Sequence, residues 1–210
     1  MEYINSLKWR YATKKFDRNK KLETEVLNRI IEAANLSATS LGFQPIKILN
    51  VQSPLLRDRI KSASFNQPQV ADASHLLILC VDADFSKENV RKYMDLVAAT
   101  RGISVADLVG YENMINGWVD GLADDEARVN WASKQAYITI GTMMAACALE
   151  KVDSCPMEGF IASQVAEVLE LDKLNLFPVL LLPVGYRSDE CSNQHLAKVR
   201  KPLSDYVINF

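Results

Sequence analysis

Apolar residues recur at two spacings along this chain, and each spacing predicts one kind of element. In the stretch from Val26 to Ala34, for example, apolar residues follow one another at spacings of three and four, which are typical of helices with one buried face. These spacings predict helices at residues 2–12, 23–36, 53–64, 86–100, 111–119, 124–150 and 163–171. Ser53, Ser86 and Asp124 suit the N-cap positions of three of these helices, because their side-chain oxygens can accept hydrogen bonds from free backbone N–H groups.

Four short segments predict β-strands instead. Residues 46–51 alternate between apolar and polar positions, which indicates a strand with one buried face. Residues 76–81 and 178–184 are apolar almost throughout, which favours strands buried on both faces, and residues 152–155 are a short fourth candidate. Because no repeat, linker or low-complexity segment interrupts this pattern, we expect one α+β domain over residues 1–210, with a mixed central sheet flanked by helices.

The expected helix at 124–150 differs from the others, because it is apolar nearly all round between Ala136 and Leu149. A helix without a polar face is usually buried. Small residues such as Gly141 and Ala145 would let a second helix approach closely, so the pattern predicts either a central core helix or the seam of a dimer. The tail at 203–210 also alternates polar and apolar positions, and it must dock on its own domain or on a partner.

Composition and charge narrow the class of protein. The 210 residues are 49% apolar and 24% charged, with a formal net charge of −2, which is ordinary for a globular domain. The apolar runs are too short to span a bilayer, and we find no signal peptide, so we expect a cytoplasmic protein. With two histidines and no Cys-x-x-Cys pair, no metal site is expected. Cys80 and Cys147 fall in apolar segments and should be buried, inert thiols.

Several common catalytic and nucleotide-binding signatures are absent. The chain has no GxGxxG, no GxxxxGK[ST] and no GxSxG, so a nucleotide would not be held by a Rossmann or P-loop turn. His75 adjoins a buried strand, which favours a structural role over catalysis. There is also no long basic stripe interleaved with aromatic residues, which argues against nucleic acid as a partner.

Two basic clusters and one turn are the strongest candidates for chemistry. Arg10 and Lys14 lie near the start of the chain, and Lys198 and Arg200 near its end. Cations gathered in short segments of a slightly acidic protein indicate a local anion site, although each cluster alone is equally typical of solvated surface. The turn at 156–160 joins Pro and Gly, so it is either an ordinary turn or a place where backbone N–H groups meet a flat ligand.

Taken together, these segments resemble the FMN-dependent nitroreductase family, in particular its oxygen-insensitive NAD(P)H nitroreductase and flavin oxidoreductase branch. Seven segments carry the resemblance, in the family's order and over most of the chain. They are Arg10–Asp17, Ser37–Pro45, Asp72–His75, Trp131–Gln135, Pro156–Phe160, Pro183–Tyr186 and Lys198–Pro202.

The resemblance implies a nitroreductase-like fold and a homodimer with one FMN at each subunit interface. The long helix would then form the dimer core, and the tail an arm over the partner. Arg10, Lys198 and Arg200 would hold the phosphate. Lys14 would face the N1/O2 edge of the isoalloxazine, where a cation stabilises the negative charge of the reduced flavin.

Further roles follow from the same resemblance. Asn66 and Gln135 would bond the pyrimidine edge or the ribityl chain. Backbone groups of Pro156, Met157, Glu158 and Gly159 would face the ring, with Glu158 and Gly159 near its N5. Backbone and packing contacts would come from Tyr11 and Ala12, and the other subunit would contribute Thr39, Ser40 and Gly42. Four positions depart from the family pattern: Ala12 replaces a serine, Gly42 an asparagine, Ile46 a tryptophan, and Gln69, which would also lie at the cofactor, a second lysine.

The implied activity is hydride transfer from NAD(P)H to flavin N5 and then to a quinone, nitroaromatic or flavin acceptor, in a ping-pong cycle. No protein acid or base is then required, and Phe65 and Trp118 are candidates for the wall of the acceptor pocket. Three alternatives remain open from the sequence. They are a related flavoenzyme with another acceptor, as in pteridine reduction or dehalogenation, a flavin- or nucleotide-binding protein without turnover, and a purely structural dimer.

Overall fold

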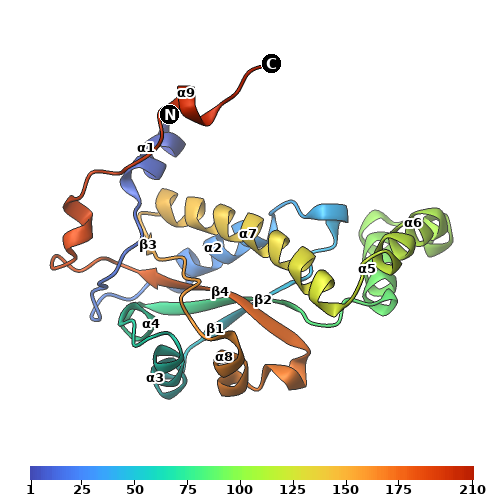
Figure 1. Ribbon diagram of the computed structural model, residues 1–210, viewed down its shortest axis with the longest axis horizontal. Helices are drawn as coiled ribbons and strands as arrows, with labels where there is room; N and C mark the ends of the chain where they lie inside the picture. Colours follow the sequence, from blue (N-terminus) through green and yellow to red (C-terminus); the bar gives the residue numbers. More distant parts are fainter.

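A four-stranded antiparallel sheet separates the helices into two layers (Figure 1). The computed structural model covers residues 1–210. The strands are ordered β1 (Ile46–Val51), β2 (His75–Asp82), β4 (Leu176–Gly185) and β3 (Asp153–Ser154) across the sheet. β1 therefore forms one edge, and the two long apolar strands β2 and β4 lie in the centre, where both of their faces are covered.

Alternate residues of β2 face opposite layers, which explains its uninterrupted apolar sequence. Leu77 and Leu79 pack into one core with α2 (Thr24–Asn35) and α7 (Asp125–Leu149). Leu76 and Ile78 pack into a second core with α3 (Pro54–Ala63) and α8 (Ala162–Leu169). All four leucine and isoleucine side chains have no exposed surface, so the sheet is held by hydrophobic burial on both sides.

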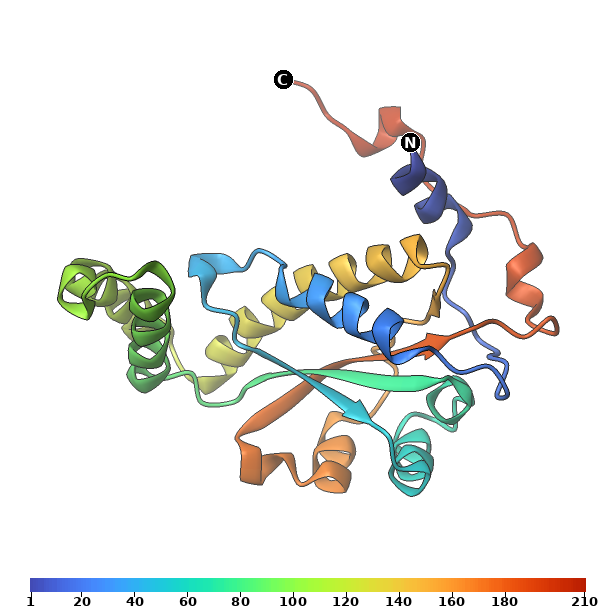
Figure 2. The same cartoon turned by 180° about the vertical axis from the view of Figure 1, so that it is seen from behind.

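Two extensions leave this body at opposite ends (Figure 2). At one end, α5 (Lys87–Arg101) and α6 (Val109–Asp120) form a helical arm with its own core, which includes Phe43, Phe85 and Met94. At the other end, α1 (Glu2–Trp9) lies beside the C-terminal residues with α9 (Leu203–Tyr206). The tail's Tyr206, Ile208 and Phe210 are exposed, so the tail docks on nothing within its own chain.

Most expected elements are confirmed, with bounds that shift by a few residues. The expected α+β class is confirmed, but the sheet is not mixed: all strand pairs are antiparallel, and only the isolated bridge between Ala12 and Ser154 is parallel. The first helix ends at Trp9 rather than at residue 12, because Arg10 turns to extended backbone. The one-turn helix α4 (Gln69–Asp72) was not expected from the sequence.

The long helix α7 is buried on one side only within the single chain. Its Ala136, Ile140 and Met143 lie in the core, whereas Ile138 and Leu149 are 51% and 41% exposed. Of the two alternatives from the sequence, a central helix covered on all sides is therefore not what the single chain forms, since α2 and the sheet cover only one face of the helix. The seam of a dimer stays a prediction. No helix in the structure combines the length and apolar content that a membrane crossing requires.

A buried arginine fixes α4 against α3. Arg57 is 8% exposed, and its guanidinium donates to the backbone carbonyls of Val70 (3.1 Å), Ala73 (2.5 Å) and Ser74 (3.3 Å). Burial lowers the pKa of Arg57. Because these carbonyls lie at the C-terminal end of α4, the arginine satisfies acceptors that no helical N–H can reach.

Replacing this arginine should therefore make the folded protein less stable. We expect Arg57→Met to lower the free energy of unfolding by about 2–4 kcal/mol, because it leaves buried carbonyls without donors. Arg59→Met on the exposed side of the same helix is the matched control and should change it by less than about 0.5 kcal/mol. Urea unfolding of the two variants measures the difference, and equal stabilities would contradict this role for Arg57.

Candidate functional site

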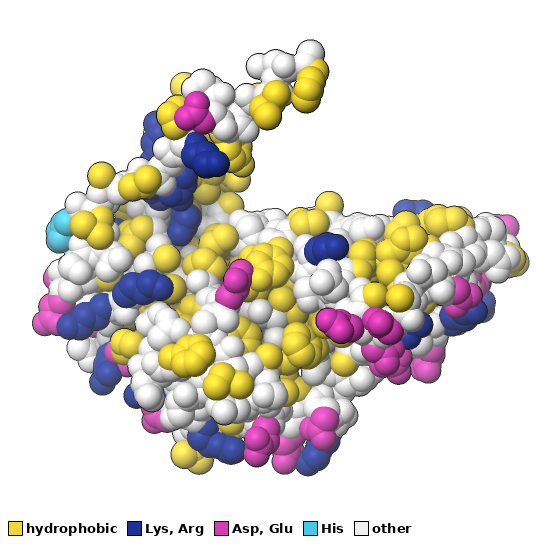
Figure 3. Space-filling view, in the orientation of Figure 1, with side chains coloured by type: hydrophobic (Ala, Val, Ile, Leu, Met, Phe, Trp, Pro, Cys, Tyr) yellow, Lys and Arg dark blue, Asp and Glu magenta, His cyan; other side chains and the backbone are white.

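Three cations converge where α1 and the C-terminal segment leave the body, and no acidic side chain neutralises them. Lys198 Nζ donates to the carbonyls of Leu7 (3.0 Å) and Arg10. None of Arg10, Lys198 and Arg200 forms an ion pair. Dark blue side chains gather at this point of the surface in Figure 3.

The electrostatics of the three cations fit an anion. Burial, followed by the charge of Arg200, lowers the pKa of Arg10. Burial and then the charges of Arg10 and Arg200 lower the pKa of Lys198. Arg10 Nε is buried without a hydrogen-bond partner, and a buried donor of this kind is costly unless a ligand satisfies it. The cluster can therefore hold a phosphate group through charge-assisted hydrogen bonds.

A buried ion pair positions the backbone that carries these cations. Asp153 is 3% exposed and accepts hydrogen bonds from Thr13 Oγ1 (3.1 Å) and from the backbone N–H of Arg187 (2.9 Å). Its carboxylate also pairs with the Arg187 guanidinium at 2.7 Å. The guanidinium lies over the rings of Trp9 and Tyr11, at 4.3 and 4.5 Å from their centroids.

Lys14 lies beside a second group of predicted residues. Its Nζ donates to the Sγ of Cys155 at 3.4 Å. Gln69 is 2% exposed and donates through Nε2 to Gln67 Oε1 at 2.9 Å, and Gln67 Nε2 donates to the Gly159 carbonyl at 2.9 Å. The structure thus brings Lys14, Gln69 and the glycine turn together, as the sequence implied.

The turn itself presents free backbone donors. Met157 pairs with Leu181 of β4 in both directions, at 2.9 and 3.1 Å, so the start of the turn is anchored to the sheet. The N–H groups of Glu158 and Gly159 donate to no backbone carbonyl. Tyr137 of α7 donates to Glu158 Oε1 at 2.7 Å, and burial together with this carboxylate raises the pKa of Tyr137 to about 12.

The serine-rich loop follows the C-terminal end of α2, whereas Lys14 precedes the N-terminal end of that helix in the chain. Ser40 N–H donates to Gln135 Oε1 at 2.9 Å, and Thr39 Oγ1 accepts from the Gln44 N–H at 3.1 Å. Thr39, Ser40, Gly42 and Gln135 therefore form a group of their own, separate from the Lys14 group within one chain.

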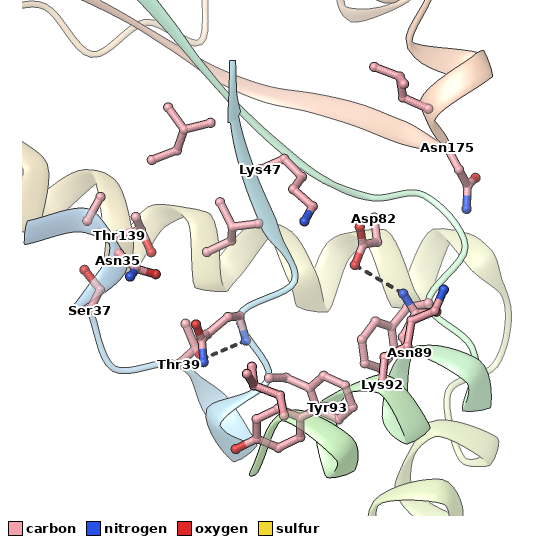
Figure 4. Close-up of a pocket in the computed structure, with 18 of the residues that line it drawn as sticks. Asn35, Ser37, Thr39, Lys47, Asp82, Asn89, Lys92, Tyr93, Thr139 and Asn175 are labelled. Atoms are coloured by element: carbon pink, nitrogen blue, oxygen red, sulfur yellow. Dashed lines mark hydrogen bonds between the residues drawn. The ribbon is translucent and has the colours of Figure 1, made fainter. Parts of the chain in front are cut away.

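A large cavity lies away from the Lys14 group. It measures about 1010 Å³ and lies beside the free edge of β1, between that strand, α2 and α5. Lys47, Asp82, Asn89 and Lys92 line it with Thr139 of α7 (Figure 4). Of the predicted site residues only Thr39 reaches it, so the cavity is polar but lacks the phosphate cations.

The two predicted pocket residues have different surroundings. Phe65 is 64% exposed, and both Phe65 and Asn66 have positive φ angles of 53° and 56° in the loop between α3 and α4. This loop adjoins Gln67 and so belongs to the Lys14 group. Trp118 instead packs its ring 4.7 Å from that of Trp131, in the core of the helical arm.

Sequence reasoning missed the residues that support the site. Asp153, Arg187, Cys155 and Gln67 each touch a predicted residue or its neighbour, yet none carries a motif of its own. The partners in these contacts are separated by 140 residues for Thr13 and Asp153 and by 92 for Gln67 and Gly159. No local pattern could reveal them, because only tertiary folding brings such positions together.

Comparisons with known proteins identify the family of this chain. The profile of the nitroreductase family matches residues 7–186. A protein of Staphylococcus epidermidis, provisionally named NAD(P)H nitroreductase, is 34% identical over 97% of this chain and 94% of its own length. A similarly named protein of Staphylococcus saprophyticus is 31% identical over the same shares of the two chains.

Solved structures show the same fold. A protein of Bacillus subtilis, provisionally named nitroreductase ydfN, has a TM-score of 0.87 at 19% identity and covers 100% of this chain and 99% of its own. A protein of Exiguobacterium sibiricum, provisionally named a nitroreductase and crystallised with FMN, has a TM-score of 0.83 at 21% identity, with 100% and 98% covered. The nitroreductase-like fold expected from the sequence is therefore confirmed.

Two tyrosines of the helical arm hold the serine-rich loop, and this contact can be tested. Gly42 has a φ of +70°, and a Cβ there would stand 2.3 Å from the Tyr93 hydroxyl; Tyr111 donates to the Leu41 carbonyl at 2.9 Å. We expect Gly42→Ala to lower the free energy of unfolding by more than the 1–2 kcal/mol of left-handed strain alone. Adding Tyr93→Phe should recover part of the loss.

The measurement is a double-mutant cycle by urea unfolding. Tyr93→Phe alone serves as the control, with an expected effect below about 0.5 kcal/mol. A coupling free energy near zero between the two positions would mean that the arm does not press on this loop in solution.

Proposed function

The chain belongs to the nitroreductase family, and from this premise we propose that it is an FMN-dependent oxidoreductase that takes reducing equivalents from NAD(P)H. The observation that carries the proposal is the trio of unneutralised cations beside the buried Arg10 Nε. A phosphate would satisfy this donor and relieve the repulsion among the cations. The FMN bound by the Exiguobacterium relative is a ligand with such a phosphate.

The other predicted residues fit the rest of the cofactor. Lys14 lies within hydrogen-bond distance of Cys155, on the side of the turn where a polar ring edge would lie. The free N–H groups of Glu158 and Gly159 would donate toward the ring. Asn66 is exposed on its strained loop beside them, and Tyr11 and Ala12 continue the backbone between the phosphate cations and Lys14.

The chemistry proposed for the site needs few protein groups. FMN, when bound, accepts hydride from NAD(P)H at N5 and passes it on in a ping-pong cycle. Lys14 would stabilise negative charge at the pyrimidine edge, since a fixed cation acts strongly where water is excluded. The turn at 156–159 would orient the ring face, and Phe65 would border the space for a flat acceptor such as a quinone, nitroaromatic or flavin.

A homodimer is part of the proposal, because one chain holds the site in two separated pieces. Ser40, which follows α2, contacts Gln135, whereas Lys14, which precedes α2, contacts Cys155. A second copy would bring its serine-rich loop, and Trp118 behind it, to the Lys14 group. The second copy would also cover the exposed Ile138 and Leu149 of α7 and the apolar residues of the tail. Exposing a contiguous apolar surface of this kind to water is unfavourable.

The first test is an anaerobic visible spectrum of the purified protein, reconstituted with FMN. We expect a flavin band near ~450 nm that bleaches with NADH or NADPH and returns with a quinone. The nucleotide that bleaches it faster identifies the donor. A bound flavin that neither nucleotide bleaches would point to binding without turnover, and failure to take up FMN would overturn the proposal.

The second test separates the phosphate from the ring. Arg200→Gln should weaken FMN binding about tenfold, because it removes one charge-assisted hydrogen bond of about 1.4 kcal/mol or more. Riboflavin, which lacks the phosphate, should bind the variant and the wild type equally. Lys201→Gln is the control at the neighbouring exposed position. An equal loss for FMN and riboflavin would show that Arg200 does not contact the phosphate.

A further inference from the structure

The Lys14 ammonium has one hydrogen-bond partner in this structure, and it is a thiol. Lys14 Nζ lies 3.4 Å from Cys155 Sγ, and no carboxylate pairs with this lysine. Lysine has four rotatable side-chain bonds and a compact charge, so without a contact its head would move over several ångströms. Cys155 is therefore the group that sets where this charge lies.

The thiol itself is held rigidly. Cys155 has no exposed surface and belongs to the core between the sheet, α3 and α8. Its backbone N–H donates to the Pro183 carbonyl of β4 at 3.1 Å. Burial raises the pKa of the Cys155 thiol, against the opposing influence of Lys14 and Gln69, so the sulfur faces the ammonium as a neutral acceptor that leaves the lysine's charge uncompensated.

The same group extends to the glycine turn. Gln69 donates to Gln67, and Gln67 donates to the Gly159 carbonyl; a Cβ on Gly159 would meet Gln67 Nε2 at 3.1 Å. These two amides are neutral, as the thiol is. Lys14 is the cation that is hydrogen-bonded within this group. The charge of Arg10 also reaches the Cys155 thiol, and the Glu158 carboxylate of the turn is held by Tyr137. The placement of Lys14 therefore contributes to the positive charge that the polar edge of a ring would feel.

We propose that Cys155 is a positioning residue: its buried thiol accepts a hydrogen bond from Lys14 and fixes the ammonium where it stabilises the reduced form of the cofactor. This inference rests on the proposed FMN function and names the residue that tunes it. Cys155 does not touch the cofactor in this assignment. It acts only through Lys14, and that dependence makes it testable.

The variant Cys155→Val keeps the shape of the side chain and removes the acceptor. We take the ammonium to move from about 4 Å to about 5 Å from the charge on the reduced ring, at an effective dielectric constant of about 20. Its attraction for the reduced cofactor then weakens by an amount equal to about a fourfold change in affinity, relative to the oxidised cofactor. We therefore expect the ratio of the dissociation constants of reduced and oxidised FMN to rise about fourfold. For a two-electron couple this lowers the midpoint potential by about 18 mV. Cys155→Ala should give the same direction, and Cys155→Ser, which keeps an acceptor, should stay within about twofold of wild type.

Two controls separate positioning from general damage to the fold. Cys80→Val makes the same change at another fully buried cysteine of the same core. Lys47 faces Cys80 across the strand pair but donates no hydrogen bond to its thiol, so this variant should leave the potential unchanged. In a Lys14→Met background, Cys155→Val should have no further effect on the potential, because the group through which it acts is gone. Urea unfolding of each apoprotein verifies that the variants fold.

The potentials are measured by anaerobic spectroelectrochemistry of FMN-loaded protein. A drop in Cys155→Val that vanishes in the Lys14→Met background supports the proposal. If wild type binds FMN and Lys14→Met lowers the potential while Cys155→Val does not, the role of Cys155 is rejected and the proposed function stands. A drop of equal size in Cys155→Ser or in Cys80→Val also rejects it. If wild type takes up no FMN, both the proposed function and this inference fall.

Discussion

The buried carboxylate of Asp153 is the contact on which the site depends. It joins three parts of the chain that are far apart in sequence: Thr13, the short strand β3 and Arg187 after β4. A buried charge is tolerated only when it is paired and hydrogen-bonded, and here three donors bind the carboxylate: Thr13 Oγ1, the Arg187 backbone N–H and Arg187 Nε. This requirement locks the backbone between Trp9 and Lys14 against the sheet and so determines where Arg10 and Lys14 lie.

Positive charge is divided between two places with different surroundings. At the phosphate cluster, Arg10, Lys198 and Arg200 repel one another without a counter-charge, which is unfavourable in the free protein and favourable once an anion binds. Near the turn, Lys14 lies beside the uncharged Cys155, and the carboxylate of Glu158 is held by Tyr137. Under the proposed function, the three clustered cations would govern binding of the phosphate, and Lys14 would tune the ring.

The chain also divides the expected site in space. The serine-rich loop, which follows α2, is held by Tyr111 and Gln135, whereas Lys14, which precedes α2, contacts Cys155 just before the glycine turn. The apolar residues left exposed on α7 and on the tail lie outside the chain's own cores. A second copy would resolve both features, because the surface that completes the site is also the one that needs cover.

The sequence by itself determined the elements, the class of fold and most of the candidate site. β1, α2 and α3 could be predicted because burial on one face imposes a local period, and β2 because burial on both faces imposes a continuous apolar run. The basic clusters and the turn could be recognised from the sequence as short motifs. Tertiary structure alone decided the strand directions, the contact of Lys14 with Cys155, and the pairing of Asp153 with Arg187. These two contacts join residues that are 141 and 34 positions apart in the chain. A local periodicity cannot predict which distant segments come together in the folded cores.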